Sequence, residues 1–152
     1  MKEFLSPGRY VDSDHPDVIA FARQHVKGTT DLERAVSLYY AVRDAIRYNP
    51  FLDFSKPDAF RASAVLEAGE GFCIGKASLL AACARAAGIE ARVGFADVKN
   101  HLTTPRLAET MGSDLFVYHG YTTELWLEGK WVKATPAFNL ELCRKFRVKP
   151  LE

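Results

Sequence analysis

The 152-residue sequence has few cysteines, and their number and spacing argue against two common kinds of small domain. Cys73, Cys83 and Cys143 form an odd set with wide gaps. A disulfide framework or a zinc site would instead show paired or closely spaced cysteines. We therefore expect three reduced thiols, with no structural metal ion and no disulfide.

The sequence also lacks an excess of charge and any long apolar run. It has 20 basic and 19 acidic residues, for a formal net charge of +1, and the basic residues are dispersed along the chain. Nothing here predicts a nucleic-acid or anionic lipid partner. The N-terminus has no apolar run typical of a signal peptide, and no stretch approaches the roughly 20 residues that span a membrane. We therefore expect a cytoplasmic protein.

Apolar residues are plentiful, since 48% of the chain is hydrophobic. That content is enough for one core, and we expect a single domain over residues 1–152. The final residues, FRVKPLE, show no clear capping signal. The native chain is therefore compatible with a continuation beyond Glu152.

The pattern of apolar residues predicts helices first and strands later. Helical spacing favours helices at 16–27 and 30–49, the second opened by a Thr30–Glu33 capping box, a short turn near 63–66 and an alanine-rich helix at 73–88. After Gly88 the period becomes two, which predicts strands at 89–98 and 115–127 and a tight turn at Glu128-Gly129 into a third strand. Residues 99–114 are interpreted as a polar surface loop. The predicted class is α+β, with helices packed on an antiparallel sheet.

The stretch GEGFCIGK places Cys73 at the start of the alanine-rich helix. A phosphate-binding loop is excluded because Glu70 stands where its first glycine belongs and Ala77 replaces the magnesium-binding hydroxyl, so we expect no nucleotide cofactor. A buried structural cysteine is one interpretation of Cys73. The other is a nucleophile, because the positive end of a helix favours a thiolate. Cys83 and Cys143 lack this setting and are interpreted as packing residues.

A cysteine nucleophile needs a base, and the sequence offers four histidines. His15 precedes a helix and suits a capping role, His25 lies near the end of the same helix, and His101 belongs to the polar loop. His119 lies inside a predicted strand, where an imidazole is costly unless it has a partner or a function. His119 is therefore the candidate base. A metal site of Cys73, His101 and His119 lacks the close ligand spacing of zinc motifs.

The order GEGFCIGKASLLAACARAAGIEARVGF, then YHGYTTELWLEGKWVKATP, resembles the transglutaminase-like superfamily, which is similar to papain-type cysteine peptidases in its core. In that family a Gly-x-Cys opens a helix, a histidine opens a strand ahead of a glutamate, and W-V-x-x-D-P ends the hairpin. The resemblance covers roughly residues 30–139. It implies a papain-like fold with Cys73 as nucleophile and His119 as general base.

One residue departs from the family pattern. Thr135 stands where the family has the aspartate that orients the histidine. A threonine accepts a hydrogen bond but cannot stabilise an imidazolium by charge, and loss of the carboxylate costs on the order of 10⁴ in rate in a serine protease. Papain-type enzymes nevertheless work with a neutral asparagine. Asn139 and Asp97 are alternative partners of the histidine, and Thr135 is otherwise an ordinary strand residue.

The strand pairing decides whether Thr135 can lie on the same face of the sheet as His119. A two-residue turn at Glu128-Gly129 places Thr135 opposite Thr122, and simple alternation then puts His119 on the other face of the sheet. In the family the run from histidine to glutamate is one residue shorter than from His119 to Glu124. We therefore predict a β-bulge at or beside Gly120 that returns His119 to the face of Thr135.

The expected chemistry is acyl transfer from a protein or peptide substrate with an amide or ester carbonyl. Release of the acyl group to water would make the protein a peptidase or amidase, and release to an amine would make it a transglutaminase. The alternative is an inactive transglutaminase-like fold that serves as a protein- or peptide-binding module. Four aromatic residues either line the substrate cleft or pack across strands: Tyr118, Tyr121, Trp126 and Trp131.

Overall fold

The computed structural model describes residues 2–99, 104–113 and 115–151. Four helices come first in the chain: α1 (Pro16–His25), α2 (Asp31–Ala45), α3 (Ala62–Ala68) and α4 (Cys73–Ala86). The antiparallel sheet β3-β4-β5 follows, built from β3 (Ala91–Lys99), β4 (Leu115–Leu127) and β5 (Lys130–Ala134). The shorter elements are η1 (Lys2–Phe4), β1 (Arg47–Tyr48), η2 (Pro57–Ala59), β2 (Glu70–Gly71), α5 (Pro105–Met111) and α6 (Leu140–Phe146). The predicted α+β class is confirmed.

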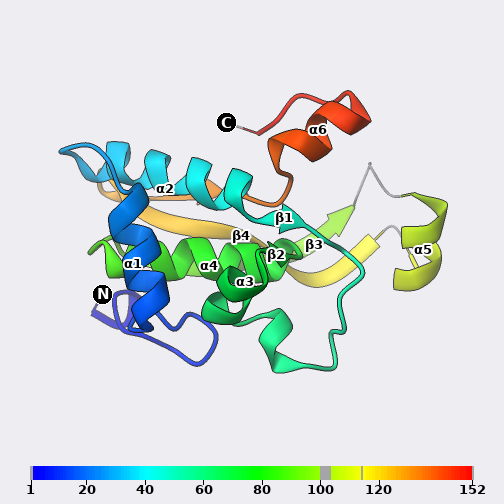
Figure 1. Cartoon of the computed structure of the whole chain (residues 1–152), viewed down its shortest axis with the longest axis horizontal. Helices are drawn as coiled ribbons and strands as arrows, with labels where there is room; N and C mark the ends of the chain where they lie inside the picture. The colour runs from blue at the N-terminus through cyan, green and yellow to red at the C-terminus, as the bar shows by residue number, and fades with distance from the viewer. Residues whose placement is uncertain (1, 100–103, 114, 152) are drawn as a thin grey trace.

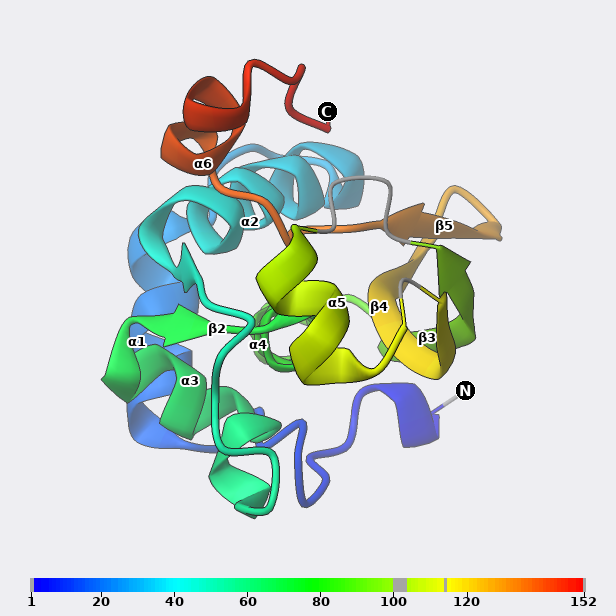
Figure 2. The ribbon, with the colours of Figure 1, turned by 90° about the vertical axis from the view of Figure 1, so that its right-hand side faces the viewer.

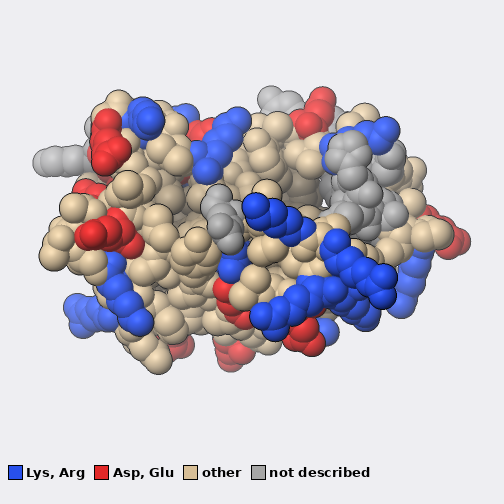
Figure 3. All heavy atoms as spheres, turned by 90° about the horizontal axis from the view of Figure 1, so that it is seen from above, with Lys and Arg blue, Asp and Glu red and all other residues tan. Residues whose placement is uncertain are grey.

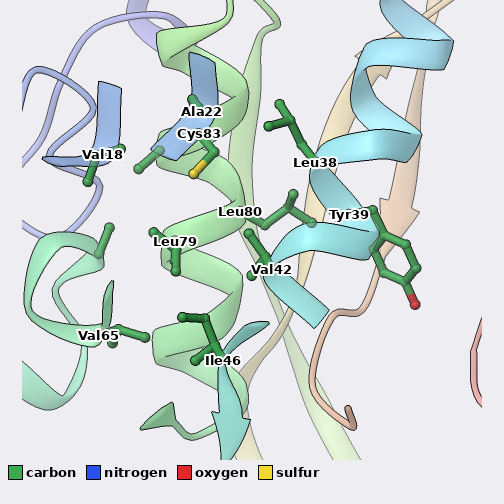
Figure 4. Close-up of a cluster of buried hydrophobic side chains, with 12 residues drawn as sticks. Val18, Ala22, Leu38, Tyr39, Val42, Ile46, Val65, Leu79, Leu80 and Cys83 are labelled. Carbon is green, nitrogen blue, oxygen red and sulfur yellow. The ribbon is translucent and has the colours of Figure 1, made fainter. Parts of the chain in front are cut away.

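Helix α4 runs through the middle of the molecule, between the other helices and the sheet (Figure 1). It is apolar on nearly all sides, as expected of a helix enclosed by other elements. Its leucines and its alanines before Ala86 are almost fully buried, and Cys83 lies among them at 0% exposure. Figure 4 shows Leu79, Leu80 and Cys83 of α4 meeting Val18 and Ala22 of α1 and Leu38 and Val42 of α2. The packing role predicted for Cys83 is confirmed.

Helix α2 begins as predicted but ends earlier. Its capping box is present, with Thr30 Oγ1 accepting from the Glu33 N–H and the Glu33 carboxylate accepting from the Thr30 N–H. It ends at Ala45 rather than near Pro50, because Arg47 and Tyr48 leave the helix and form β1, which pairs in parallel with β2. A two-residue strand is too short to show alternation in the sequence.

The β4–β5 hairpin follows the predicted register. Glu128 and Gly129 both adopt positive φ, of 52° and 81°, as the two central residues of a type I′ turn require. Thr123 pairs with Ala134, so Thr135 continues opposite Thr122. In the β3–β4 ladder, Gly94 pairs with Thr122 and Phe95 with Gly120, which leaves one extra residue, Tyr121, in β4. The predicted bulge beside Gly120 is confirmed.

Two helices differ from the sequence-based prediction. The interpretation of residues 99–114 as a loop is wrong over Pro105–Met111, which form α5. Proline suits the first turn of a helix, where its missing N–H has no partner to lose. The C-terminal segment likewise contains α6, which ends at Arg147 in a left-handed conformation. Within the described residues, none of the helices has both the length and the apolar character needed to cross a bilayer.

Candidate active site

Cys73 is the first residue of α4, as predicted, and glycines before and after it allow this placement. Gly69 ends α3 in the left-handed conformation, with φ of 65°. A Cβ on Gly71 would lie 2.9 Å from Val65 Cγ1, and one on Gly75 would lie 2.7 Å from the Ala59 carbonyl oxygen. Close approach of α4 to α3 therefore requires both of these glycines, and it fixes the position of the Cys73 backbone.

The Cys73 thiol meets the hydroxyl of Tyr48 from β1. Their Sγ and Oη atoms are 3.6 Å apart in a hydrogen bond. The Tyr48 ring is held by Phe72 and Phe138, with centroid separations of 5.8 and 4.9 Å. Burial raises the pKa of Tyr48, so its hydroxyl keeps its proton and stays available as a donor. The thiol therefore has a rigid hydrogen-bonding partner.

His119 packs against Phe72, the residue immediately before Cys73. The centroids of the His119 and Phe72 rings are 5.1 Å apart in an edge-to-face arrangement. His119 is only 6% exposed, and burial lowers its pKa. The structure thus brings the predicted base to the start of the helix that carries the thiol, and it favours the neutral imidazole.

The ionisation of Cys73 differs from the prediction made from the helix N-terminus. Burial raises the pKa of Cys73 to about 11, while the hydrogen bond with Tyr48, a backbone hydrogen bond and the charge of Lys76 act in the opposite direction. Desolvation of the thiolate outweighs the helix dipole and these contacts. These pKa shifts favour a protonated thiol on Cys73 and a neutral imidazole on His119 near neutral pH.

Lys76 lies one turn after Cys73 and is completely buried. Its Nζ donates hydrogen bonds to the carbonyl oxygens of Arg43, at 2.9 Å, and Ile46, at 2.6 Å, which are left without helical partners where α2 ends. Burial lowers the pKa of Lys76 to about 7. This lysine joins the start of α4 to the end of α2, and so to the neighbouring strand that carries Tyr48.

The three candidates for orienting His119 have different surroundings. Thr135 donates to Thr122 Oγ1 at 3.0 Å, and Thr122 donates to the Ala134 carbonyl oxygen at 3.0 Å. The bulge restores alternation, so His119 falls on the same face of the sheet as these two threonines. The side-chain oxygen of Asn139 accepts from the Tyr48 N–H at 3.2 Å, which ties Asn139 to β1. Asp97 is exposed on β3.

The remaining histidines and cysteines lie elsewhere in the chain. His15 caps α1 by accepting from the Asp17 N–H, as predicted, and His25 bonds to the Phe21 carbonyl oxygen within α1. His101 lies outside the described residues. Cys143 is buried in α6, where its Sγ donates to the Phe138 carbonyl oxygen at 3.8 Å. His15 and His25 are therefore both engaged within α1.

The two tryptophans of the hairpin pack together, as one of the two interpretations predicted. Trp126 and Trp131 meet across the strands at 5.4 Å, and Trp131 also contacts Phe4. The side chain of Tyr118 lies outside the described part. Over residues 2–99, 104–113 and 115–151, no three histidine, cysteine or acidic residues gather in a way that could hold a metal ion.

Sequence reasoning missed Tyr48 and Lys76. Tyr48 follows α2 directly and shows no motif of its own, and Lys76 looked like part of a degenerate phosphate loop. Only the packing of α2 and β1 against α4 places their polar atoms beside the thiol. A lysine within an otherwise apolar helix was the one available signal, because such a residue needs partners when it is buried.

Comparisons with known proteins agree with this geometry. A family model described as the transglutaminase-like superfamily matches residues 19–136. Among solved structures, a protein from Cytophaga hutchinsonii described as a "putative cysteine protease" superposes with a TM-score of 0.67 at 20% sequence identity. The match covers 90% of this chain and 41% of that one, and it shows a shared fold. A comparison with curated proteins finds no match.

Proposed function

Because the chain belongs to the transglutaminase-like superfamily, we propose that it is a cysteine acyl-transfer enzyme in which Cys73 is the nucleophile and His119 the general base. One observation carries the proposal. The Cys73 thiol, at the first residue of α4, contacts the Tyr48 hydroxyl at 3.6 Å, while the His119 ring packs against the adjoining Phe72 at 5.1 Å. The proposed nucleophile Cys73, the proposed base His119 and the hydroxyl group of Tyr48 therefore all lie around Phe72.

In the first step His119 takes the thiol proton as Cys73 Sγ attacks the carbonyl carbon of the substrate. Transfer of the proton from a neutral thiol to a neutral imidazole during the attack suits the raised pKa of Cys73 and the lowered pKa of His119. The oxyanion that forms accepts hydrogen bonds from backbone N–H groups in the first turn of α4, which have no helical partners. The Tyr48 hydroxyl, which is held rigidly, is positioned to be a further donor.

In the second step the tetrahedral intermediate collapses. The carbon–nitrogen or carbon–oxygen bond breaks, imidazolium His119 gives its proton to the leaving group, and a thioester to Cys73 remains. Water, deprotonated by neutral His119, then attacks the thioester and releases the acid and the free thiol. Thr135 orients the imidazole through its hydroxyl, on the sheet face that it shares with His119.

We propose hydrolysis of peptide or other amide bonds as the overall reaction. The structural neighbour is described as a cysteine protease, and the resting neutral pair needs only water to complete the cycle. Transfer to an amine would use the same thioester and the same residues. The acyl-enzyme on Cys73 is thus common to both outcomes.

The alternative is an inactive fold that binds proteins or peptides. Two observations favour it: the carboxylate position of the family is occupied by Thr135, and the pKa of Cys73 is raised to about 11. An inactive protein would retain the buried thiol as a packing group and would form no thioester.

An acyl probe directed at cysteine separates the two proposals. We expect a peptidyl acyloxymethyl ketone to label Cys73 in the wild-type protein near pH 7.5, as located by mass spectrometry of the peptides. His119→Ala should lower the labelling rate on the order of 10²–10⁴-fold, because the base is lost.

Cys143→Ser serves as the control, because it removes a thiol that bonds to the Phe138 carbonyl oxygen rather than to Cys73, and it should label at the wild-type rate. Labelling of Cys73 no faster than that of a small free thiol, with no effect of His119→Ala, would leave the binding module as the better account.

A further inference from the structure

A cavity of about 460 Å³ adjoins the start of α4 on the side that faces β3. Its walls come from four parts of the chain: the segment before α1, the residue after η2, helix α4 and strand β3. The main lining residues are Tyr10, Phe60, Ile74, Ser78, Val93 and Phe95. No charged side chain stands among the described lining residues. The cavity therefore suits an apolar group.

The cavity reaches the candidate nucleophile and base through their immediate neighbours. Ile74 follows Cys73 in α4, and Gly120 follows His119 in β4. A Cβ on Gly120 would lie 3.0 Å from Phe95 Cε1, 3.2 Å from Ile74 Cγ2 and 3.3 Å from Val93 Cγ1. Three lining side chains thus meet beside the residue that follows His119, so the cavity lies close to the place where the reaction would occur.

The rim of the cavity leaves large apolar surface in water. Phe95 is 58% exposed and Tyr10 39% exposed. Figure 2 looks toward the end of the molecule where α4 begins, and it shows the N-terminal segment and β3 flanking that end of the helix. A ligand that covers the two rings would gain about 25 cal/mol per Å² of apolar surface removed from water.

We propose that this cavity binds an aromatic or branched aliphatic side chain of the acyl-donor peptide, next to the carbonyl that Cys73 attacks. The inference rests on the proposed function and names the substrate class for the same site. The volume lies within the roughly 300–1,000 Å³ of ligand pockets, and the apolar lining would select against charged side chains. A glycine in the substrate would leave the cavity unfilled.

The first test compares acetyl-phenylalanine and acetyl-glycine p-nitrophenyl esters. We expect kcat/KM to be at least 10-fold higher for the phenylalanine ester, since contacts in an apolar pocket give about 10–200-fold discrimination per methylene. Phe95→Asp should bring the ratio of the two kcat/KM values down at least fivefold. Phe146→Asp, which changes an exposed phenylalanine on α6, should keep the wild-type ratio. A wild-type ratio near one, or a ratio unaffected by Phe95→Asp, would overturn the proposal.

A second measurement does not depend on turnover. In Cys73→Ala we expect acetyl-phenylalaninamide, and not acetyl-glycinamide, to shift the methyl NMR signals of Ile74 and Val93, and we expect Phe95→Asp to abolish the shifts. Binding without turnover by the wild-type protein would support the cavity and reject the enzyme proposal. Turnover without these shifts would overturn the cavity alone, and absence of both would overturn both proposals.

Discussion

At the scale of single residues, the position of Cys73 at a helix start and the burial of its thiol favour opposite ionisation states. The first turn of a helix favours a thiolate, but the pKa of the buried thiol is raised to about 11. A reaction of this thiol at neutral pH therefore needs help at the moment of attack. The groups that could give it are the His119 imidazole, which takes the proton, and the Tyr48 hydroxyl, which donates to sulfur or oxyanion.

Replacing Tyr48 by phenylalanine tests the hydroxyl alone. The ring would keep its contacts with Phe72 and Phe138, so the free energy of unfolding should change little. Loss of one oxyanion donor should lower the rate of Cys73 acylation on the order of 10²-fold, with a smaller change in KM. Acylation kinetics and thermal unfolding, measured on the same variant, check both expectations. A wild-type acylation rate would show that the hydroxyl takes no part in the reaction.

Thr135→Asp tests the departure from the family pattern. A carboxylate at this position would stabilise the imidazolium form of His119 and raise the histidine pKa, so we expect kcat to rise at least 10-fold. Thr135→Asn, which adds a neutral side chain of similar size, is the matched control and should raise kcat less. An NMR titration of His119 would report the shift directly. If Asp leaves both the histidine pKa and kcat unchanged, Thr135 does not act on His119.

At the scale of the elements, Lys76 links α4 to the end of α2. Its pKa is lowered to about 7, below the usual lysine value, so the folded state binds this proton less tightly than the unfolded chain. Stability should consequently rise with pH from about 7, by at most about 1.4 kcal/mol per pH unit. Above about pH 9 the buried cysteines oppose the rise, because their raised pKa values favour the protonated folded state.

The Lys76→Met substitution should make the free energy of unfolding depend less on pH. The variant leaves the Arg43 and Ile46 carbonyl oxygens without their donor, which we expect to cost about 1–3 kcal/mol at pH 9. Urea unfolding between pH 7 and 9 measures both effects. Lys27→Met, at an exposed position after α1, is the control and should keep the wild-type slope. An equal slope in Lys76→Met and wild type would contradict this account of the buried amine.

Elements with strong local signals were predictable, and those that depend on distant partners were not. The α2 capping box, helix α4 and the β4–β5 hairpin are encoded by nearby residues, and the bulge followed from counting residues against the alternation of the strand. Strand β1 exists because β2 lies beside it, although 21 residues separate the two strands in the sequence. Helices α5 and α6 have seven residues each, too few for a clear period.

The same division holds for the candidate site. Cys73 and His119 could be proposed from the sequence because each stands out in its own element, at a helix start and inside a strand. Tyr48 comes from a strand that no pattern indicated, and its hydroxyl reaches the thiol only after α2 packs on α4. The cavity beside Gly120 needs four separate segments. Local signals therefore indicated the two candidate residues, and tertiary packing supplied their surroundings.

At the scale of the whole molecule, charge is less evenly spread than the sequence predicted. Four exposed basic residues lie close together at the C-terminal end, in α6 and just after it: Arg144, Lys145, Arg147 and Lys149. Figure 3 views the face that carries α6 and shows lysine and arginine side chains gathered toward one end of it. In Figure 1, α1 and η1 lie away from α6 and its four basic residues.

The two ends of α4 are also unlike. The last residue of α4, Ala86, is exposed to solvent, whereas the beginning at Cys73 points toward α5, which lies beyond it in Figures 1 and 2. From α5, Arg106 reaches over the Phe51 ring, at 4.4 Å from its centroid. The candidate site and the apolar cavity thus share the same end of the molecule, where a peptide would approach both together.

The pH dependence of Cys73 acylation tests the central claim, that thiol and imidazole act together, most directly. In the wild-type protein the rate should level off above the pKa of His119, which burial places below its usual value of 6.5, because the neutral ring is then the base. In His119→Ala the rate should instead keep rising toward the pKa of Cys73, about 11. Identical profiles for the two proteins would contradict the account.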